Sequence, residues 1–566
     1  MKHFKDIRLS RDRHPLAVTS GIWLLVALIV PSVALCFTEH YNVLVSVGCV
    51  SVPLAVYCLI MSLCKTPWKT WLWMLPFTFF AAFQVVLLNL YGSGVIAVDM
   101  FLNVATTNTT EVYELLSGLL PGMIEIMVLY ITPLVLAILA IKRGGHFPQK
   151  MRVRLRKCGW FMAVVGVVAF IVAWLVGMSV RPVRQIFPAN AIDNLITSIK
   201  RWNQTENYPE TSADFTFDAK SIHPADSVET YVLVVGESSR ALDWQLSGYD
   251  RPTNPKLSGK DGLTYFPKTL SESNTTHKSV PILLSHIGSA EFNDSINKVK
   301  SIVAAFKEAG FRTSYFTMQR PNHSYIDFFA AEADSHIFVE PAKGEVKNDL
   351  DLLPLLDKEL ARPEKKKLIV LHCYGSHYNY RDRYPASMSH FTPDNNLESA
   401  KECRPRLINA YDNTILLTDS LLSAVINRLD KTQGISAMAY TSDHGENIYD
   451  DSRNLFLHAS PKTSYYQQHV PFLVWLSRSY SGFNPSAAKA VRKHASERVS
   501  SSASMFHTVA DLGGVSTPYL KKSLSVADSS YAAPPAVFIN DYNEAVPIDQ
   551  VLTDPLDQKM MRHFGF

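Results

Sequence analysis

Long apolar runs dominate the first third of the chain, and each is long enough to cross a lipid bilayer. A membrane-spanning helix needs about 20 consecutive, mostly apolar residues. Five stretches meet this length: Ala17–Phe37, Val43–Leu63, Trp71–Tyr91, Leu119–Ile141 and Gly159–Met178. The first differs from a cleaved signal peptide, because its apolar core is too long and four more spans follow it. The pattern predicts an α-helical membrane domain of five transmembrane helices over residues 1–180.

Basic residues between the runs predict the orientation of the spans. Lys and Arg precede the first span and follow the second and the fourth, whereas the alternate loops Thr38–Asn42 and Gly92–Gly118 contain neither residue. Because short loops rich in Lys and Arg remain in the cytoplasm, the N-terminus is predicted to be cytoplasmic. Five spans are an odd number, so the chain after Met178 is expected on the opposite side of the membrane.

The chain becomes polar after the last apolar run. Residues 181–227 carry apolar side chains at a spacing that suits an amphipathic helix on the membrane surface, namely Ile186, Phe187, Ile192 and Ile196. The stretch Asn203–Asp226 is rich in Ser, Thr and Asp and contains two prolines. We interpret residues 181–227 as an interfacial helix followed by a linker.

From Val228 onward, apolar strand patterns alternate with helical ones. Strands are predicted at Tyr231–Val235, Thr313–Phe316, Lys367–His372, Ala437–Thr441 and Phe472–Leu476. Helices are predicted at Ile296–Ala309, Leu350–Leu360 and Leu407–Leu429. This alternation predicts an α/β doubly wound domain over residues 228–566, with a mainly parallel sheet and helices on both faces.

Charge and cysteine content narrow the possible classes of protein. The chain has 55 Lys and Arg against 51 Asp and Glu, a net charge of +4, which by itself argues neither for nor against nucleic acid. The basic residues of the first third lie in short loops between apolar runs, which is typical of a membrane protein rather than a DNA-binding one. Five of the seven cysteines lie in or beside the apolar spans, which leaves only Cys373 and Cys403 for the rest. A disulfide framework is therefore not expected.

Two of the predicted strands end in polar side chains. The run Tyr231–Val235 lacks alternation, as is typical of a strand buried on both faces, and Glu237 follows it. Asp443 and His444 follow the strand at Ala437–Thr441 in the same way. Ligands collect at the carboxyl ends of parallel strands, and zinc accepts carboxylate oxygen and imidazole nitrogen. The alternative is that Glu237 caps a helix and the Asp-His pair stabilises a turn.

Thr276 is the candidate nucleophile. It lies in the stretch Ser271–Leu284, in a loop that leads into an apolar helix start. A threonine hydroxyl is a poor nucleophile until a base takes its proton or a divalent metal stabilises the alkoxide. Without a metal nearby, Thr275 and Thr276 would instead be helix-capping hydroxyls.

Six short motifs occur in a specific order. They are G-E-S at Gly236–Ser238, T-x-x-S-V-P at Thr276–Pro281, G-S-H at Gly375–His377, Y-D-N at Tyr411–Asn413, S-D-H-G-E at Ser442–Glu446 and L-H at Leu457–His458. The set resembles the phosphoethanolamine transferases of the Gram-negative inner membrane, which belong to the alkaline phosphatase and sulfatase superfamily. The resemblance covers essentially the whole chain, because that family also has five spans followed by a periplasmic hydrolase-like domain.

The resemblance implies a zinc-dependent transfer in two steps. Phosphoethanolamine would pass from phosphatidylethanolamine to Thr276, releasing diacylglycerol, and then to lipid A or a lipopolysaccharide core sugar. The implied ligands of one tightly bound zinc ion are Glu237, Thr276, Asp443 and His444. His377 and His458 match histidines around the phosphate, which would bind it or a second zinc ion and protonate the leaving alkoxide. Gln319 falls where the family contacts the donor phosphate.

One face of the Gly92–Gly118 loop also matches the family. Asn103, Thr107 and Glu111 are spaced by four, so on a helix they would share one face. By residue type alone this is a solvated face of an interfacial helix. The family pattern N-x3-T-x3-E implies instead that it binds the lipid substrate, with Glu111 suited to the ammonium group of ethanolamine.

Three further features lie near the nucleophile or at the end of the chain. Many family members flank this loop with paired cysteines, whereas this chain has Glu272 and Ile282, so the loop is expected to be held by packing and metal alone. His277 and Lys278 would be either solvated or in contact with phosphoryl charge. The segment Tyr519–Phe566 is expected to wrap the edge of the domain, without an assigned role.

The implied protein is a multi-pass, monomeric inner-membrane enzyme with a periplasmic catalytic domain and a lipopolysaccharide-type acceptor. The main alternative is a phosphoglycerol transferase of the lipoteichoic-acid-synthase type; glucans or proteins are alternative acceptors of phosphoethanolamine. A true sulfatase is disfavoured because the C-x-P-x-R type context is lacking. A non-catalytic receptor on the same fold would have no need to keep Glu237, Thr276, Asp443 and His444 together.

Overall fold

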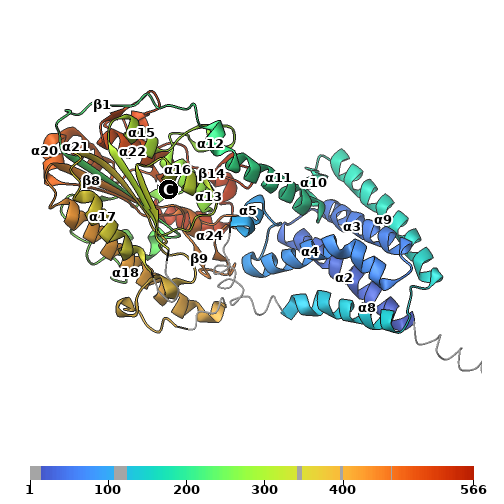
Figure 1. Ribbon diagram of the computed structural model, residues 1–566. Coiled ribbons are helices and arrows are strands. Elements are labelled where there is room, and N and C mark those ends of the chain that lie inside the picture. Colours follow the sequence, from blue (N-terminus) through green and yellow to red (C-terminus); the bar gives the residue numbers. More distant parts are fainter. Residues whose placement is uncertain (1–13, 107–123, 341–346, 396–399, 460–461) are drawn as a thin grey trace, which may run out of the picture. The chain divides into compact units, whose positions relative to one another are not determined.

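The computed structural model describes residues 14–106, 124–340, 347–395, 400–459 and 462–566 (Figure 1). The described residues fall into two compact units. The first is drawn from Met1–Phe101 and Leu115–Ile199, and the second from Leu102–Glu114 and Lys200–Phe566.

The first unit is helical, as predicted. Five of its described helices are long and apolar enough to cross a membrane: Pro15–Thr38 (within α2, His14–Thr38), Val43–Leu63 (α3), Pro67–Tyr91 (α4), Ile124–Lys142 (which ends as α8, Thr132–Lys142) and Gln149–Leu175 (α9). Helix α9 begins ten residues before the predicted apolar span and includes a basic run. Apolar composition marks only the part of a helix that suits hydrocarbon, and flanking Lys and Arg side chains extend the same helix into the interface.

Glycines allow α3 and α9 to pack closely. A Cβ atom on Gly48 would lie 2.6 Å from the Phe170 ring, and one on Gly166 would lie 2.7 Å from Val52. Small residues at such positions let helix backbones approach where no hydrophobic effect drives association.

The stretch after the last span is folded. Helices α10 (Pro182–Gln185) and α11 (Ala189–Glu206) agree with the predicted amphipathic segment, and α11 exposes Ile196 and Ile199. The interpretation of Asn203–Asp226 as a linker is wrong, because Tyr208 and Phe217 are buried in the core of the second unit. The free energy gained by burying these two aromatic side chains outweighs the tendency of the surrounding polar residues to stay in solvent.

A seven-stranded sheet forms the centre of the second unit. Its order is β3 (Leu263–Tyr265), β11 (Phe472–Leu476), β8 (Ile435–Ser442), β2 (Glu229–Gly236), β7 (Lys366–His372), β5 (Arg312–Thr317) and β6 (Ser335–Phe338). The five strands from β8 to β6 are parallel, whereas β11 and β3 are antiparallel to their neighbours. All five predicted strands are confirmed. The short edge strands β3 and β6 were not predicted.

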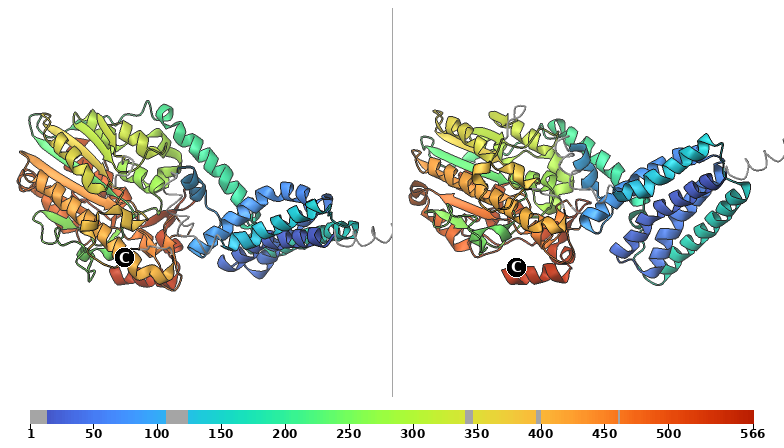
Figure 2. Two further views of the ribbon diagram at one scale, coloured as in Figure 1. Left: turned by 60° about the horizontal axis from the view of Figure 1, so that its bottom comes forward. Right: turned by 90° about the horizontal axis from the view of Figure 1, so that it is seen from below.

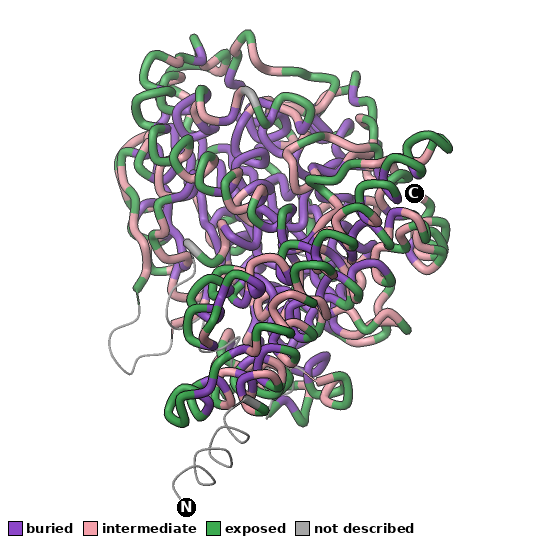
Figure 3. The backbone as a smooth tube through the Cα atoms, turned by 90° about the vertical axis from the view of Figure 1, so that its right-hand side faces the viewer, coloured by how far each residue is buried: buried purple, intermediate pink, exposed green. Residues whose placement is uncertain are grey.

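Helices cover both faces of the sheet (Figures 1 and 2). Alternate residues of β2 enter two separate hydrophobic clusters: Tyr231, Leu233 and Val235 in one, Val232 and Val234 in the other. The first cluster includes α13 (Thr276–Leu284), α15 (Ile302–Glu308) and α22 (Ser501–Leu512); the second includes α17 (Leu353–Leu360) and α18 (Arg404–Leu429). The doubly wound fold is thus confirmed, and buried residues gather through its middle (Figure 3).

The predicted helix Ile296–Ala309 is interrupted. A 3-10 turn covers Ile296–Lys298, and α15 starts only after Ser301, whose hydroxyl accepts a hydrogen bond from Val303 N. Serine is one of the residues preferred at a helix N-cap, so a new helix begins after Ser301. Helix α17 is likewise preceded by a 3-10 turn, Asp349–Leu352.

Shorter elements complete the chain. The helices are α5 (Val98–Thr106), α12 (Tyr208–Thr211), α14 (Phe292–Ser295), α16 (Tyr325–Ala331), α19 (Tyr465–Gln468), α20 (Arg478–Phe483), α21 (Pro485–His494), α23 (Ile548–Val551) and α24 (Pro555–Phe564). The strand pairs are β1 (Lys220–Ser221) with β13 (Val515–Ser516), β4 (Thr269–Leu270) with β12 (Val499–Ser500), β9 (Asn447–Ile448) with β10 (Phe456–Leu457), and β14 (Val537–Ile539) with β15 (Ala545–Pro547).

Candidate metal centre

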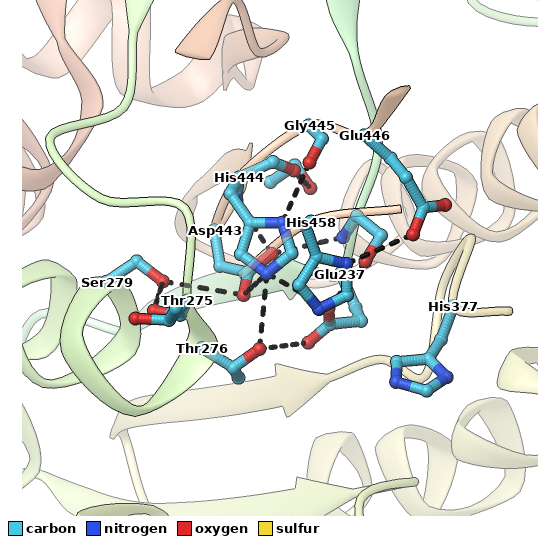
Figure 4. Close-up of polar contacts among 12 residues, drawn as sticks. Glu237, Thr275, Thr276, Ser279, His377, Asp443, His444, Gly445, Glu446 and His458 are labelled. Carbon is cyan, nitrogen blue, oxygen red and sulfur yellow. Dashed lines mark hydrogen bonds and ion pairs between the residues drawn. The ribbon is translucent and has the colours of Figure 1, made fainter. Parts of the chain in front are cut away.

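The predicted ligands meet at the carboxyl end of the parallel strands (Figure 4). Strands β2 and β8 are adjacent and parallel, with Gly236 paired to Ser442. Glu237 follows the first strand, and Asp443 and His444 follow the second, so the register alone brings them together. All three side chains are at most 1% exposed.

Thr276 lies at the first position of α13 and faces these groups. Its Oγ1 is 3.2 Å from Glu237 Oε2 and 3.3 Å from His444 Nε2. The helix-capping alternative does not hold for Thr275, which occupies the N-cap position without a side-chain capping bond. The threonine hydroxyl therefore points at candidate ligands rather than at the helix backbone.

Hydrogen bonds orient the His444 ring. Its Nδ1 is 2.9 Å from Gly445 O, so Nδ1 carries the proton and Nε2 presents a lone pair. Nε2 lies 3.2 Å from Asp443 Oδ2 and 3.5 Å from Glu237 Oε1. Burial lowers the pKa of His444 to about 4, which keeps the ring neutral at neutral pH.

His458 joins the same group. One ligand atom each from Glu237, His444 and His458 lies within 4.8 Å of the others. His458 Nδ1 bonds Glu446 Oε1 at 3.0 Å, and Tyr380 OH donates to Glu446 Oε2 at 2.6 Å. Glu446 belongs to the S-D-H-G-E motif, but the sequence analysis assigned it no role. Its position two residues after His444 is the feature that could have identified it as a site residue.

The donor set fits a divalent metal such as zinc. Burial, together with the negative charge of Asp443, raises the pKa of Glu237 well above its ordinary value. Two carboxylates held this close in a buried site repel each other, and a bound cation would reverse that repulsion. Carboxylate oxygens and neutral imidazole nitrogens are the ligands that zinc accepts.

Gln319 and His377 lie at the edge of this group. Gln319 Nε2 donates to Glu237 Oε2 at 3.3 Å and to Cys373 O at 3.1 Å. The His377 ring centre is 6.1 Å from that of His458, and its Nδ1 bonds Tyr378 O at 2.7 Å. Burial lowers the pKa of His377 well below its ordinary value.

Gly375 makes room for Glu237. It has φ +54°, and a Cβ atom there would lie 2.6 Å from Glu237 O. Its backbone NH donates to Asp349 Oδ2 at 3.0 Å, which fixes the turn after β7. Only glycine combines this conformation with this close approach.

The remaining predicted substrate residues are only partly described. Asn103 is half-buried near the end of α5. Thr107 and Glu111 lie outside the described residues, so the shared face of the three stays a prediction.

Hydrogen bonds hold the segment around the candidate nucleophile Thr276, residues 271–284, called the nucleophile segment below. Glu272 accepts hydrogen bonds from Ser289 Oγ and Ser500 Oγ through its two carboxylate oxygens, and its backbone carbonyl accepts one from Ile539 N at 2.7 Å. The expectation that packing and metal alone hold this loop is therefore wrong. Buried Lys278 donates to Asn540 O at 2.8 Å, so it is not solvated. Part of the C-terminal segment, to which the sequence assigned no role, thus supports the segment that carries the candidate nucleophile Thr276.

All seven cysteines lie in described ranges, and none forms a disulfide. This confirms the expectation from the sequence. The hydrogen bonds of Glu272 cross-link three segments without a covalent bond.

Two family models match the chain. The one described as "Sulfatase" matches residues 229–515, just over half of the chain. The one described as "Phosphoethanolamine transferase EptA/EptB" matches residues 53–202.

The curated relatives of the chain include phosphoethanolamine transferases. The Kdo(2)-lipid A phosphoethanolamine 7''-transferase of Escherichia coli K12 is 32% identical over 284 residues, which cover 49% of this chain and 48% of that protein. The chain spans about half the length of the curated relatives it matches.

Two solved structures establish the shared fold. The integral membrane lipooligosaccharide phosphoethanolamine transferase A of Neisseria meningitidis has a TM-score of 0.69 at 21% identity, covering 90% of this chain and 97% of that one. The periplasmic domain of Escherichia coli EptC in complex with Zn has a TM-score of 0.53 at 23% identity, covering 59% and 96%.

Replacing Glu237 is expected to weaken zinc binding. Glu237→Gln keeps the shape of the side chain but removes the negative charge, so zinc affinity should fall at least about tenfold, as for loss of a metal-site partner. Zinc titration of the purified chain against a chelator measures this. The exposed Glu544→Gln is the matched control, and equal affinity in both variants would remove Glu237 from the ligand set.

Gly375→Ala is expected to destabilise the fold by about 1–3 kcal/mol, because the new methyl group meets Glu237 O in a strained conformation. Thermal unfolding measures the change. Gly288→Ala is the control, since a Cβ atom there meets nothing within 4 Å. An unchanged unfolding temperature for Gly375→Ala would contradict the close approach.

Glu272 is expected to make stability depend on pH. Burial raises its pKa to about 7, although the Ser500 hydrogen bond and the Arg498 charge oppose the rise. The folded chain then binds more protons than the unfolded chain between about pH 4.5 and 7, so stability falls as pH rises, by on the order of 3 kcal/mol. Glu272→Gln should lack this fall. Parallel pH profiles of the unfolding temperature for both proteins would disprove the assignment.

Proposed function

The chain belongs to the sulfatase family, and from that premise we propose that it transfers phosphoethanolamine from phosphatidylethanolamine to an envelope glycolipid, lipid A or a lipopolysaccharide core. The observation that carries this proposal is the Thr276 hydroxyl, held against Glu237 and His444. The match of residues 53–202 to a phosphoethanolamine transferase model and the names of the relatives support the choice of substrate class.

We propose one zinc ion as the cofactor. Glu237, Asp443 and His444 would hold it together with Thr276, and His458 is close enough to add a further ligand. Bound there, zinc would lower the pKa of the threonine hydroxyl and offset phosphoryl charge. The zinc complex of the EptC domain is consistent with this choice.

Thr276 carries the first step. Its Oγ1 attacks the phosphorus of phosphatidylethanolamine, the bond from phosphorus to the glycerol oxygen breaks, and diacylglycerol leaves. Glu237 Oε2, 3.2 Å away, is placed to take the hydroxyl proton. An acceptor oxygen then attacks the same phosphorus, the bond from phosphorus to Thr276 Oγ1 breaks, and Thr276 receives the proton that an acceptor hydroxyl releases.

The histidines handle protons around the phosphoryl group. Neutral His377 donates through Nδ1 and keeps a lone pair on Nε2. It therefore enters the cycle as a base. In the first step the proton taken from Thr276 would pass through His377 to the leaving glycerol oxygen, and in the second step His377 would take the proton of an acceptor hydroxyl and return it to Thr276. His458 is fixed by Glu446, so its ring keeps one orientation toward the phosphate.

The membrane unit fits this chemistry, because both proposed substrates are lipids. We propose that the chain is a monomer in the inner membrane. The distribution of Lys and Arg supports a cytoplasmic N-terminus and a periplasmic catalytic unit. Asn103, Thr107 and Glu111 are proposed to contact the lipid substrates, and Gln319 the donor phosphate.

Intact mass spectrometry of the full chain tests the proposal. After incubation with zinc and phosphatidylethanolamine, the chain should gain one phosphoethanolamine. Thr276→Ala should gain none, because the attacking oxygen is absent. Thr275→Ala, which loses the neighbouring hydroxyl, is the control and should still be labelled.

Other outcomes separate the alternatives. A phosphoglycerol adduct from phosphatidylglycerol would establish the phosphoglycerol transferase instead. Absence of any adduct on folded, zinc-loaded protein would reject the donor or the nucleophile. Incubating the labelled chain with lipid A, glucan or protein then identifies the acceptor.

A further inference from the structure

A cavity apart from the candidate metal centre is lined by residues of the C-terminal helices α23 and α24. Its volume is about 370 Å³, within the usual range for small-molecule sites. Its wall is mainly apolar and includes Ile548, Leu552, Met561 and Phe566. None of the candidate metal ligands lines it.

Two arginines make this apolar cavity unusual. Arg498 and Arg562 line it together with one acidic residue, Asp549, so the lining carries an excess of positive charge. Arg498 donates to Pro534 O through Nη2, whereas its buried Nη1 has no hydrogen-bond partner among the described residues. An unsatisfied buried donor is costly, and a guanidinium group is best satisfied by a carboxylate or phosphate oxygen.

We propose that this cavity binds a single-chain anionic amphiphile, whose acyl chain fills the apolar wall and whose carboxylate or phosphate pairs with Arg498 and Arg562. A free small anion would leave the apolar wall empty, and an uncharged chain would leave Arg498 Nη1 unpaired. The ligand is not the diacylglycerol released in the proposed transfer, because that product is neutral. The inference does not depend on the proposed transfer reaction.

The cavity is connected to the nucleophile segment. Arg498 directly precedes β12, which pairs with β4 through Val499↔Thr269 and Ser500↔Leu270. Ser500 Oγ donates to Glu272, four residues before Thr276. An anion bound to Arg498 would therefore support β12, whose Ser500 bonds Glu272 in the nucleophile segment. This contact gives the amphiphile a route to influence the reaction.

Photo-crosslinking of the full chain in phosphatidylcholine nanodiscs tests this. The probe is a twelve-carbon fatty acid with a diazirine at the end of its chain, followed by peptide mapping. Labelling is expected on α23 and α24, near Met561. Unlabelled dodecanoate should compete, whereas dodecanol and inorganic phosphate should not.

Variants separate charge from apolar contact. Arg498→Gln and Arg562→Gln should each reduce labelling about tenfold, the factor that corresponds to one charge-assisted hydrogen bond. Arg492→Gln removes an exposed arginine of α21 that does not line the cavity, and should change nothing. Met561→Trp should fill the cavity and block labelling without removing a charge.

Three results would overturn the proposal. Labelling elsewhere, or none, would mean that the cavity is not a ligand site. Equal competition by dodecanol, with full labelling of the arginine variants, would mean an apolar cavity without anion recognition. Competition by phosphate alone would mean a small-anion site.

If Arg498→Gln fails to fold, the exposed Arg562→Gln decides the role of charge. Because labelling is read without turnover, failure of the transfer reaction leaves each outcome readable.

Discussion

Two carboxylates, Glu237 and Asp443, sit side by side in a buried site because β2 and β8 are paired in parallel with Gly236 opposite Ser442. Removing carboxylates from water costs several kcal/mol each unless hydrogen bonds or cations compensate. Part of the compensation is visible: Asp443 accepts from Ser238 N and His444 N, and Glu237 accepts from Ser238 Oγ, Thr276 and Gln319. A bound divalent cation would offset the remaining cost, so the burial that destabilises the two carboxylates also favours metal binding between them.

The surrounding structure serves to keep this pair in place. Gly375 lets the β7 turn pass against the Glu237 backbone, and Ser239 N donates to Ser442 Oγ to join the two strand ends. Glu446 and Tyr380 form a buried chain behind His458.

The sequence predicted what local pattern can encode. Continuous apolar runs identified β2 and β8, and the polar residues after them identified Glu237, Asp443 and His444 as neighbours. An apolar run does not indicate the direction of its strand in the sheet, so the antiparallel β11 could not be distinguished from the parallel strands. The linker interpretation failed because two aromatic residues, Tyr208 and Phe217, bury themselves within a polar stretch. The hydrogen bonds of Glu272 join residues 17 and 228 positions apart, and no local pattern reveals such partners. The family motif identified His458 as a candidate, but only the folded structure shows that it lies close to Glu237.

The contacts of residues 539 and 540 with the nucleophile segment have a consequence for biosynthesis. Ile539 N binds the backbone of Glu272, and Asn540 O binds Lys278. Chains are made from the N-terminus at about 5–20 residues per second, and domains fold as their parts emerge. The candidate metal ligands are complete by His458 and the sheet by Leu476 at the end of β11, yet the segment of Thr276 lacks these supports until about 60 more residues have been added. A newly made chain therefore passes through an interval in which its sheet is in place but the segment of Thr276 lacks part of its support. That segment is fully held only when residues 539–540 have docked.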